Sequence, residues 1–129
     1  MALKFCFDTT FLIDLQKERG KGNAHTFLDE HRDALFFWSA VTLGEFAEGF
    51  ASTDDPMLAH YLRVATLLEI NSETALIYSR LTCALRRAGK LIGANDLWIA
   101  SHTLQHELTL VTADPTHFSR VPNLRFLTY

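Results

Sequence analysis

Four short apolar segments alternate with stretches of helical spacing, and this alternation constrains the fold of the chain more than any other feature. The segments are rich in aromatic or branched side chains and are short, as buried strands are. They are 3–7 (LKFCF), 34–38 (ALFFW), 108–111 (LTLV) and 124–127 (LRFL). The last segment alternates apolar residues with Arg125, which is the pattern of an edge strand.

Between these segments, apolar residues recur three and four positions apart, as they do along one face of an amphipathic helix. This spacing predicts helices over 58–68 and 77–88. It also predicts a helix that begins after Asn95 and reaches Leu108, and a shorter helix over 24–31. Strands separated by helices predict an α/β fold in which a parallel sheet is covered on both faces.

The composition fits one globular domain over residues 1–129. Hydrophobic residues make up 48% of the chain, which is enough for a packed core and excludes disorder as the main description. No apolar stretch approaches the roughly 20 residues that span a bilayer, and Asp8 interrupts the N-terminal apolar residues, so a cytoplasmic protein is expected. The net charge of -3 argues against coating of nucleic acid by bulk charge, but not against a nuclease whose metal ions supply positive charge.

Acidic residues lie where predicted strands end or predicted helices begin. Asp8 ends the first strand, and Glu45 lies shortly after the second. Asp96 opens a helix, and Asp114 follows the third strand. In parallel α/β sheets, ligands bind at the carboxyl edge, where the following helices begin. The four acids are therefore expected to converge on that edge.

Each of these acids also has a structural explanation. Thr42 and Glu45 fit a capping box. Asp114 precedes a proline and fits an N-cap, while Asp8 and Asp96 fit the acidic starts of helices. Four carboxylates at one edge would nevertheless repel one another unless a cation lay between them. Mg²⁺ or Mn²⁺ is the expected cation, because hard cations prefer carboxylate oxygens.

Such a site suits metal-assisted hydrolysis of a phosphodiester. The chain carries no GxSxG elbow, no GxxxxGK[ST] phosphate loop and no GxGxxG fingerprint. A phosphatase of the haloacid-dehalogenase type would use Asp8 as nucleophile, but its D-x-D pattern is absent because Thr10 stands at the second position. A zinc site is disfavoured as well, since His102 and His106 lack the glutamate of an HExxH motif.

At these same residues the sequence resembles the PIN-domain ribonucleases, and specifically the VapC-type toxins of prokaryotic toxin–antitoxin pairs. The resemblance covers nearly the whole chain. Its segments are DTTFLID after the first strand, TLGEFAEG, IGANDLWIA and LVTADPTHFSRVPNLRFL. The third segment is the most specific, because a small loop, Asn95-Asp96 and an apolar helix occur together there in that family.

The resemblance implies a single PIN domain over residues 1–129, with a parallel sheet of four to five strands flanked by helices. It implies a Mg²⁺- or Mn²⁺-dependent endoribonuclease that forms a homodimer. The partner would be an antitoxin whose C-terminal tail lies in the active-site groove. The implied metal ligands and catalytic residues are Asp8, Glu45, Asp96 and Asp114.

Other residues are expected to support this site. The Thr112 and Thr9 hydroxyls can hydrogen-bond a carboxylate or a metal-bound water, although solvated hydroxyls are the alternative. Arg86, Arg87 and Lys90 are expected to contact RNA phosphate, with complementation of a helix dipole as the alternative for the two arginines. A further alternative for the whole chain is a catalytically silent or housekeeping PIN-like module that binds RNA or protein.

Overall fold

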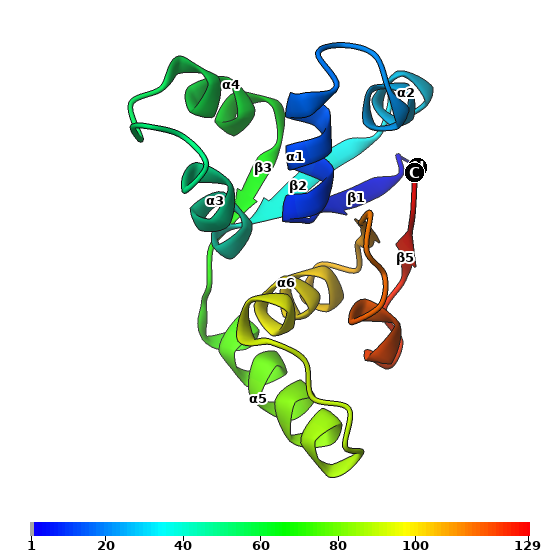
Figure 1. Cartoon of the computed structure of the whole chain (residues 1–129). Helices are drawn as coiled ribbons and strands as arrows, with labels where there is room; N and C mark the ends of the chain where they lie inside the picture. Colours follow the sequence, from blue (N-terminus) through cyan, green and yellow to red (C-terminus); the bar gives the residue numbers. More distant parts are fainter. Residues whose placement is uncertain (1) are drawn as a thin grey trace.

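The computed structural model describes residues 2–129 and contains one sheet of five parallel strands. The order of the strands across the sheet is β3-β2-β1-β4-β5 (Figure 1). Their bounds are β1 Lys4–Phe7, β2 Leu35–Ser39, β3 Thr66–Leu68, β4 Thr109–Val111 and β5 Phe126–Leu127. The predicted α/β fold with a parallel sheet of four to five strands is therefore confirmed.

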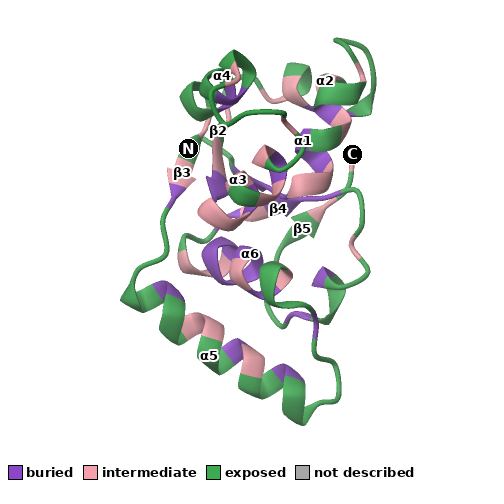
Figure 2. Cartoon of the chain, turned by 60° about the vertical axis from the view of Figure 1, so that its left-hand side comes forward, coloured by how far each residue is buried: buried purple, intermediate pink, exposed green. Residues whose placement is uncertain are grey.

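Helices cover both faces of this sheet. Four of them, α1 to α4, lie on one side, and α5 and α6 lie on the other (Figure 1). The helices are α1 Thr9–Lys17, α2 Asn23–Glu30, α3 Ala40–Ala47, α4 Pro56–Val64, α5 Ser72–Arg87 and α6 Ala94–Gln105, with a short 3₁₀ helix, η1, at Phe118–Arg120. In Figure 2 the inward side of α6 is buried, whereas much of α5 faces solvent.

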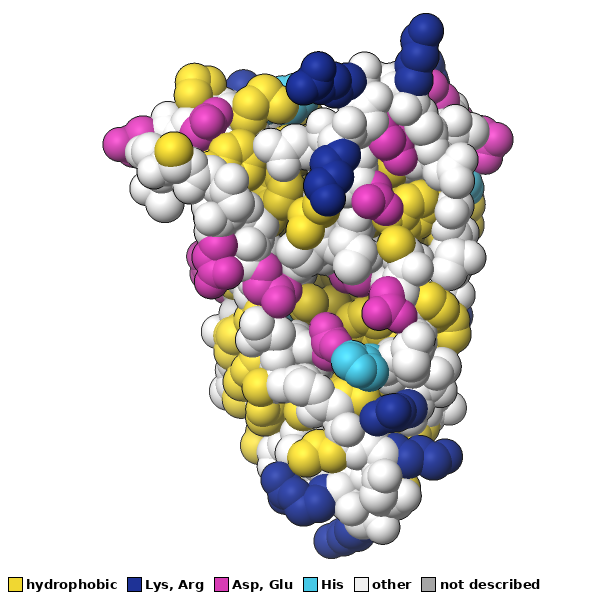
Figure 3. All heavy atoms as spheres, in the orientation of Figure 1, with side chains coloured by type: hydrophobic (Ala, Val, Ile, Leu, Met, Phe, Trp, Pro, Cys, Tyr) yellow, Lys and Arg dark blue, Asp and Glu magenta, His cyan; other side chains and the backbone are white. Residues whose placement is uncertain are grey.

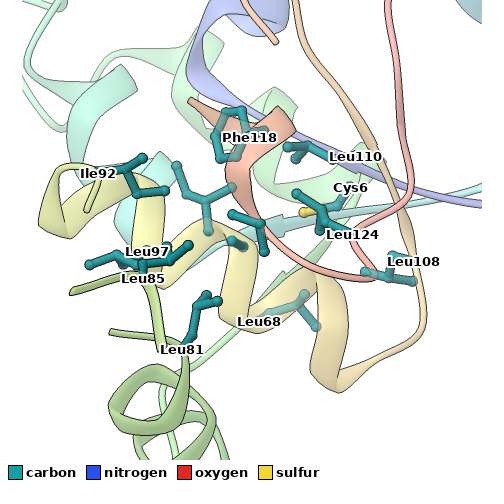
Figure 4. Close-up of a cluster of buried hydrophobic side chains, with 13 residues drawn as sticks. Cys6, Leu68, Leu81, Leu85, Ile92, Leu97, Leu108, Leu110, Phe118 and Leu124 are labelled. Atoms are coloured by element: carbon teal, nitrogen blue, oxygen red, sulfur yellow. The ribbon is translucent and has the colours of Figure 1, made fainter. Parts of the chain in front are cut away.

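Alternation along the strands divides the hydrophobic interior into two cores. Phe5 and Phe7 of β1 point toward α1, where Phe7 stacks on Phe11 at a centroid distance of 4.5 Å. Cys6 points the other way and packs with Leu110 of β4 in the core beneath α5 and α6 (Figure 4). Because both faces of the central strands are apolar and covered, functional polar groups are left to the ends of the strands.

One predicted helix is wrong in its second half. The apolar spacing over 58–68 predicts a continuous helix, but α4 ends at Val64 and the chain becomes extended at Ala65. Residues Thr66–Leu68 then form β3 and pair in parallel with β2. Only Thr66 of this strand is β-branched, so the pairing with β2, a neighbour remote in sequence, outweighs the helical spacing.

The predicted helix after Asn95 also ends earlier than expected. It stops at Gln105, and Glu107 adopts a positive φ of 53° that turns the chain back toward the sheet. Leu108 is buried in the core, although it lies outside the helix. No helix among residues 2–129 is long and apolar enough to cross a membrane.

A buried histidine connects α6 to the carboxyl ends of β2 and β3. His102 of α6 is fully buried, with Nδ1 2.9 Å from Ser39 Oγ and Nε2 3.1 Å from the carbonyl oxygen of Glu69. A carbonyl only accepts, so Nε2 carries the hydrogen and Nδ1 of the neutral ring accepts from the serine hydroxyl. Burial lowers the pKa of His102, and the nearby His106 lowers it further.

This lowered pKa predicts a loss of stability in mild acid. The unfolded chain binds a proton to His102 near its ordinary pKa of 6.5, whereas the folded chain resists it. The contribution of neutral His102 to the free energy of unfolding should therefore be complete above pH 6.5. It should be lost as the pH falls from 6.5 through the folded pKa, with a slope of at most about 1.4 kcal/mol per pH unit. Urea unfolding between pH 7.5 and 5 measures it. His102→Gln should flatten the slope, and the exposed-site control His60→Gln should not; equal slopes in all three proteins would contradict this account.

Candidate active site

The strand order places the site between β1 and β4. The connection from β1 leads to β2 on one side, whereas β4 lies on the other side, so the crossovers diverge from these two neighbouring strands. At such a switch point the carboxyl edge of a parallel sheet is open to ligands. Asp8 directly follows β1, and Thr112 directly follows β4.

Asp8 is a buried carboxylate that accepts three hydrogen bonds. Only 4% of the residue is exposed. Its Oδ1 accepts from the Phe11 amide at 3.1 Å and from Thr10 Oγ1 at 2.6 Å, and its Oδ2 accepts from Thr112 Oγ1 at 2.6 Å. Burial raises the pKa of Asp8 and the charge of Asp96 adds to this, while the three hydrogen bonds oppose the shift. Asp8 thus caps α1, as the structural explanation predicts, and also faces the site.

The loop after β4 is tied to the start of α1 through two threonines. Thr112, which is fully buried, donates to Asp8 and accepts from the Asp114 amide at 3.1 Å. Thr10 Oγ1 accepts from the Ala113 amide at 2.9 Å. These contacts cross the switch point and fix the two loops relative to each other.

Glu45 reaches the site from the last turn of α3. Its Oε1 accepts from Thr9 Oγ1 at 2.7 Å, and its Oε2 accepts from Asn95 Nδ2 at 3.1 Å. The capping box expected at Thr42 and Glu45 is not formed, because α3 begins earlier and the Ser39 hydroxyl caps it. The glutamate is therefore held by the starts of two other helices and not by its own.

Asp96 lies in the first turn of α6. Its side chain is 31% exposed, and its Oδ2 lies 2.9 Å from Nδ1 of His117, a residue of the loop after β4. Gly93 precedes the helix as its N-cap without a side-chain hydrogen bond. The carboxylate of Asp96 therefore complements the helix start electrostatically and points toward the site rather than capping the helix.

Asp114 lies at the outer rim. It is exposed, and its Oδ1 accepts from the Thr116 amide at 3.2 Å, so it caps a tight turn and not the first turn of a helix. Hydrogen bonds from Thr116 lower the pKa of Asp114, and the neighbouring His117 contributes to the same direction. The carboxylate stays ionised, but its hydrogen bond directs it along its own loop.

The basic residues expected to contact RNA lie beyond this rim. Arg86 and Arg87 end α5, and Lys90 follows in the loop to α6; all three are exposed. Arg120 of η1 joins them, since its Nη1 donates to the Leu91 carbonyl at 3.3 Å. In Figure 3 acidic side chains and a histidine occupy the middle of one face, and Lys and Arg side chains gather at the end formed by α5 and the following loop.

The donor set fits a hard divalent cation in its chemistry. All four predicted ligands supply carboxylate oxygens, which Mg²⁺ and Mn²⁺ prefer. The raised pKa of Asp8, next to the charge of Asp96, marks a carboxylate that a cation would stabilise. Among residues 2–129, however, no group of three or more Asp, Glu, His or Cys side chains is already close enough to hold a metal ion. The carboxylates are instead hydrogen-bonded to threonine, asparagine and histidine side chains.

Two residues of this site escape the sequence-based prediction. Asn95 contacts Glu45 across 50 positions of sequence, and His117 contacts Asp96 across 21 positions. The adjacency of Asn95 to Asp96 was one available signal for the first. His117 carries no comparable signal, because only the folded loop after β4 brings it to α6.

The fold and the acid-lined edge together define an α/β protein of the PIN type. The PIN domain family profile matches residues 5–124, and the chain belongs to this family. The predicted family is therefore confirmed. The chain is 28% identical to Ribonuclease VapC1 of Haemophilus influenzae strain R2866 over 127 residues, and this match covers 95% of each chain. It is 31% identical over 91 residues to Ribonuclease VapC2 of Rickettsia felis, covering 67% of this chain and 68% of the relative.

Solved structures show the same fold. The chain superposes on the structure of VapBC2 from Rickettsia felis bound to a promoter DNA fragment with a TM-score of 0.84, 22% identity and coverage of 98% and 99% of the two chains. It superposes on VapBC-1 from nontypeable Haemophilus influenzae with a TM-score of 0.81, 25% identity and 98% coverage of both chains. The layered arrangement described above is thus shared along almost the entire chain.

Proposed function

We propose that this chain is a Mg²⁺- or Mn²⁺-dependent endoribonuclease that acts as the toxin of a VapC-type toxin–antitoxin pair. The observation that carries the proposal is the buried Asp8 carboxylate at the switch point. Glu45 is hydrogen-bonded to Thr9, which follows Asp8, and to Asn95, which precedes Asp96. The likeness to curated VapC ribonucleases over 95% of the chain supports it. Residues 1–129 act as one domain, and the site of action is the cytoplasm, where the RNA substrate lies.

Different residues of the chain would bind the metal and hold its ligands in place. Asp8, Asp96, Glu45 and, at the rim, Asp114 supply the ligands. When bound, the metal neutralises charge on the scissile phosphate and lowers the pKa of the attacking water. Thr112 and Thr9 hold the Asp8 and Glu45 carboxylates at 2.6 and 2.7 Å, which fixes two ligands from different layers before the substrate arrives.

The direct test incubates the purified chain with structured RNA in Mg²⁺, in Mn²⁺ and in excess chelator. Cleavage in the two metals and none in chelator is expected. Metal-independent cleavage would overturn the mechanism, and absence of cleavage of every RNA in the presence of metal would favour the catalytically silent alternative.

Substrate binding adds a basic surface, which we define as Arg86, Arg87, Lys90 and Arg120. Among residues 2–129, none of these four side chains forms a salt bridge. Their charges are therefore available to RNA phosphates, which attract cationic side chains without regard to sequence. The two arginines in the last turn of α5 also complement the helix dipole, and the two roles are compatible.

Replacing Arg86, Arg87 and Lys90 together by glutamine is expected to weaken RNA binding. The slope of log K against log salt should fall by about 0.7 for each lost contact to single-stranded RNA. Fluorescence anisotropy of a single-stranded RNA in chelator measures this without cleavage. The matched control replaces Lys4, Arg63 and Arg125, which lie at or before the amino ends of strands and so away from the site. Equal weakening by both triple variants would show that only net charge matters.

An apolar groove offers a binding surface for the expected protein partner. It lies between α1, α2 and α4, has a volume of about 210 Å³ and is lined only by apolar and aromatic residues, among them Leu12, Leu15, Leu28, Tyr61 and Val64. Val64 is 53% exposed there. Such a groove fits the apolar face of an amphipathic helix. The structural neighbours include VapBC complexes, so we assign this groove to the antitoxin, whose tail continues into the acidic site.

The tail is expected to carry an arginine or lysine that pairs with the carboxylates. Such a pair would take the place of the metal's charge and block the binding of RNA. A homodimer is part of the same proposal. Large apolar side chains exposed on and beside α5 support it, with Leu76 59% and Leu91 45% exposed.

A further inference from the structure

His117 connects the loop after β4 to the first turn of α6. Its Nδ1 lies 2.9 Å from Oδ2 of Asp96. A carboxylate only accepts hydrogen bonds, so Nδ1 carries the hydrogen and donates. Nε2 is not needed for this contact, and the contact therefore forms whether or not Nε2 is protonated.

Packing in the hydrophobic core positions the two side chains that make this contact. Phe118, which follows His117, is 3% exposed, and Leu97, which follows Asp96, is 2% exposed. Both belong to the core cluster beneath α6 (Figure 4). Because each polar residue is the immediate neighbour of a buried one, packing of Phe118 and Leu97 brings the imidazole and the carboxylate together at the edge of the sheet.

The backbone around His117 is held in a compact turn. The Ser119 amide donates to the Pro115 carbonyl at 2.8 Å, and the Arg120 amide donates to the His117 carbonyl at 3.1 Å. The Asp114 side chain closes the preceding turn onto Thr116. The ring therefore approaches Asp96 from an ordered support rather than from a free loop.

We propose that His117 is a positioning residue for the metal site, in which its Nδ1–H fixes the orientation of the Asp96 carboxylate. With Oδ2 engaged by the ring, Oδ1 would be the oxygen available to the metal. Hydrogen bonds to ligating carboxylates are a recurrent feature of metal sites, and their loss typically costs 10–100-fold in metal affinity or activity. The inference rests on the proposed function of Asp96 as a ligand.

Exposure distinguishes this role from a contribution to folding. The His117 and Asp96 side chains are 50% and 31% exposed. Pairs as accessible as this contribute little to stability. A residue that mattered only for the fold would change the melting temperature, whereas a positioning residue changes metal affinity and leaves the metal-free protein almost as stable as before.

Two substitutions test the donor itself. His117→Asn keeps an amide nitrogen at the place of Nδ1, and His117→Leu removes the donor while keeping bulk. Mn²⁺ affinity is measured from the electron paramagnetic resonance signal of the free ion, and melting of the metal-free proteins is measured alongside. We expect His117→Leu to raise the Kd for Mn²⁺ by about 10–100-fold and to melt as the wild type does. His117→Asn should stay within about threefold of the wild type.

Asp96→Asn separates the two proposals. If it weakens Mn²⁺ binding and His117→Leu does not, the role of His117 is wrong and the metal site stands. If neither weakens binding, the proposed site itself fails. Equal loss in His117→Asn and His117→Leu would also overturn the positioning role, since the restored donor would have no effect. Adding His117→Leu to Asp96→Asn should cause no further loss, because the two act through one contact.

Discussion

Asp96→Asn is expected to lower RNA cleavage by at least about 100-fold, more than loss of an outer-shell partner costs, while the metal-free fold stays as stable as before or becomes more stable. Asparagine preserves the shape of the side chain and a tolerable helix start. It also removes a like charge that raises the pKa of the buried Asp8. The helix-dipole contribution that is lost is only about 0.3–1 kcal/mol.

Melting temperatures with and without Mn²⁺, measured beside cleavage, test this expectation. The added stability that Mn²⁺ gives the wild type should shrink in Asp96→Asn, because a ligand stabilises a fold only through its affinity for the folded state. Asp29→Asn on the exposed surface of α2 is the matched control and should change neither quantity. An Asp96→Asn protein that melts earlier and cuts RNA normally would show that Asp96 serves only the helix.

Removal of the metal is the second large effect. At a Mn²⁺ concentration 100 times its Kd, the metal should stabilise the chain by about 2.7 kcal/mol, and chelation should abolish both this increment and cleavage. Potassium chloride at equal ionic strength controls for screening. An unchanged melting temperature on addition of chelator to the Mn²⁺-loaded protein would contradict the site.

The same stabilisation should depend on pH through Asp8. The folded pKa of Asp8 is raised above its ordinary value of 3.8, so protonation favours the metal-free fold, and that contribution is lost as the pH rises through the folded pKa. Metal binding has the opposite dependence, because it requires the ionised carboxylate. The Mn²⁺-induced rise in melting temperature should therefore shrink as the pH falls toward the pKa of Asp8.

The fold was accessible from the sequence where local pattern and tertiary packing agree. The alternation in 3–7 places Phe5 and Cys6 on opposite faces, as β1 requires. The pattern in 58–68 was misleading, because apolar spacing cannot reveal that Thr66–Leu68 pairs with a strand from a distant part of the chain. Short strands whose only support is such pairing are invisible to periodicity.

For the candidate site, the sequence indicates which acids lie at the carboxyl edge but not what holds them. The positions of Asp8 and Asp96 were predictable, because Asp8 lies at the end of a strand and Asp96 at the start of a helix. The Ser39 cap displaces the capping box expected for Glu45, since α3 begins directly at the end of β2. Contacts such as that of His117 with Asp96 depend on how two loops pack, and no local pattern encodes them.

The most direct measurement of the central claim is the chemistry of the RNA ends produced in Mn²⁺. Water activated at the carboxylate edge attacks phosphorus without using the RNA 2′-hydroxyl, so products should carry 5′-phosphate and 3′-hydroxyl ends. Mass spectrometry of a short labelled RNA after cleavage by the wild type reads these ends, with Asp96→Asn as the inactive reference. Products ending in 2′,3′-cyclic phosphate, or cleavage that continues in excess chelator, would contradict the account.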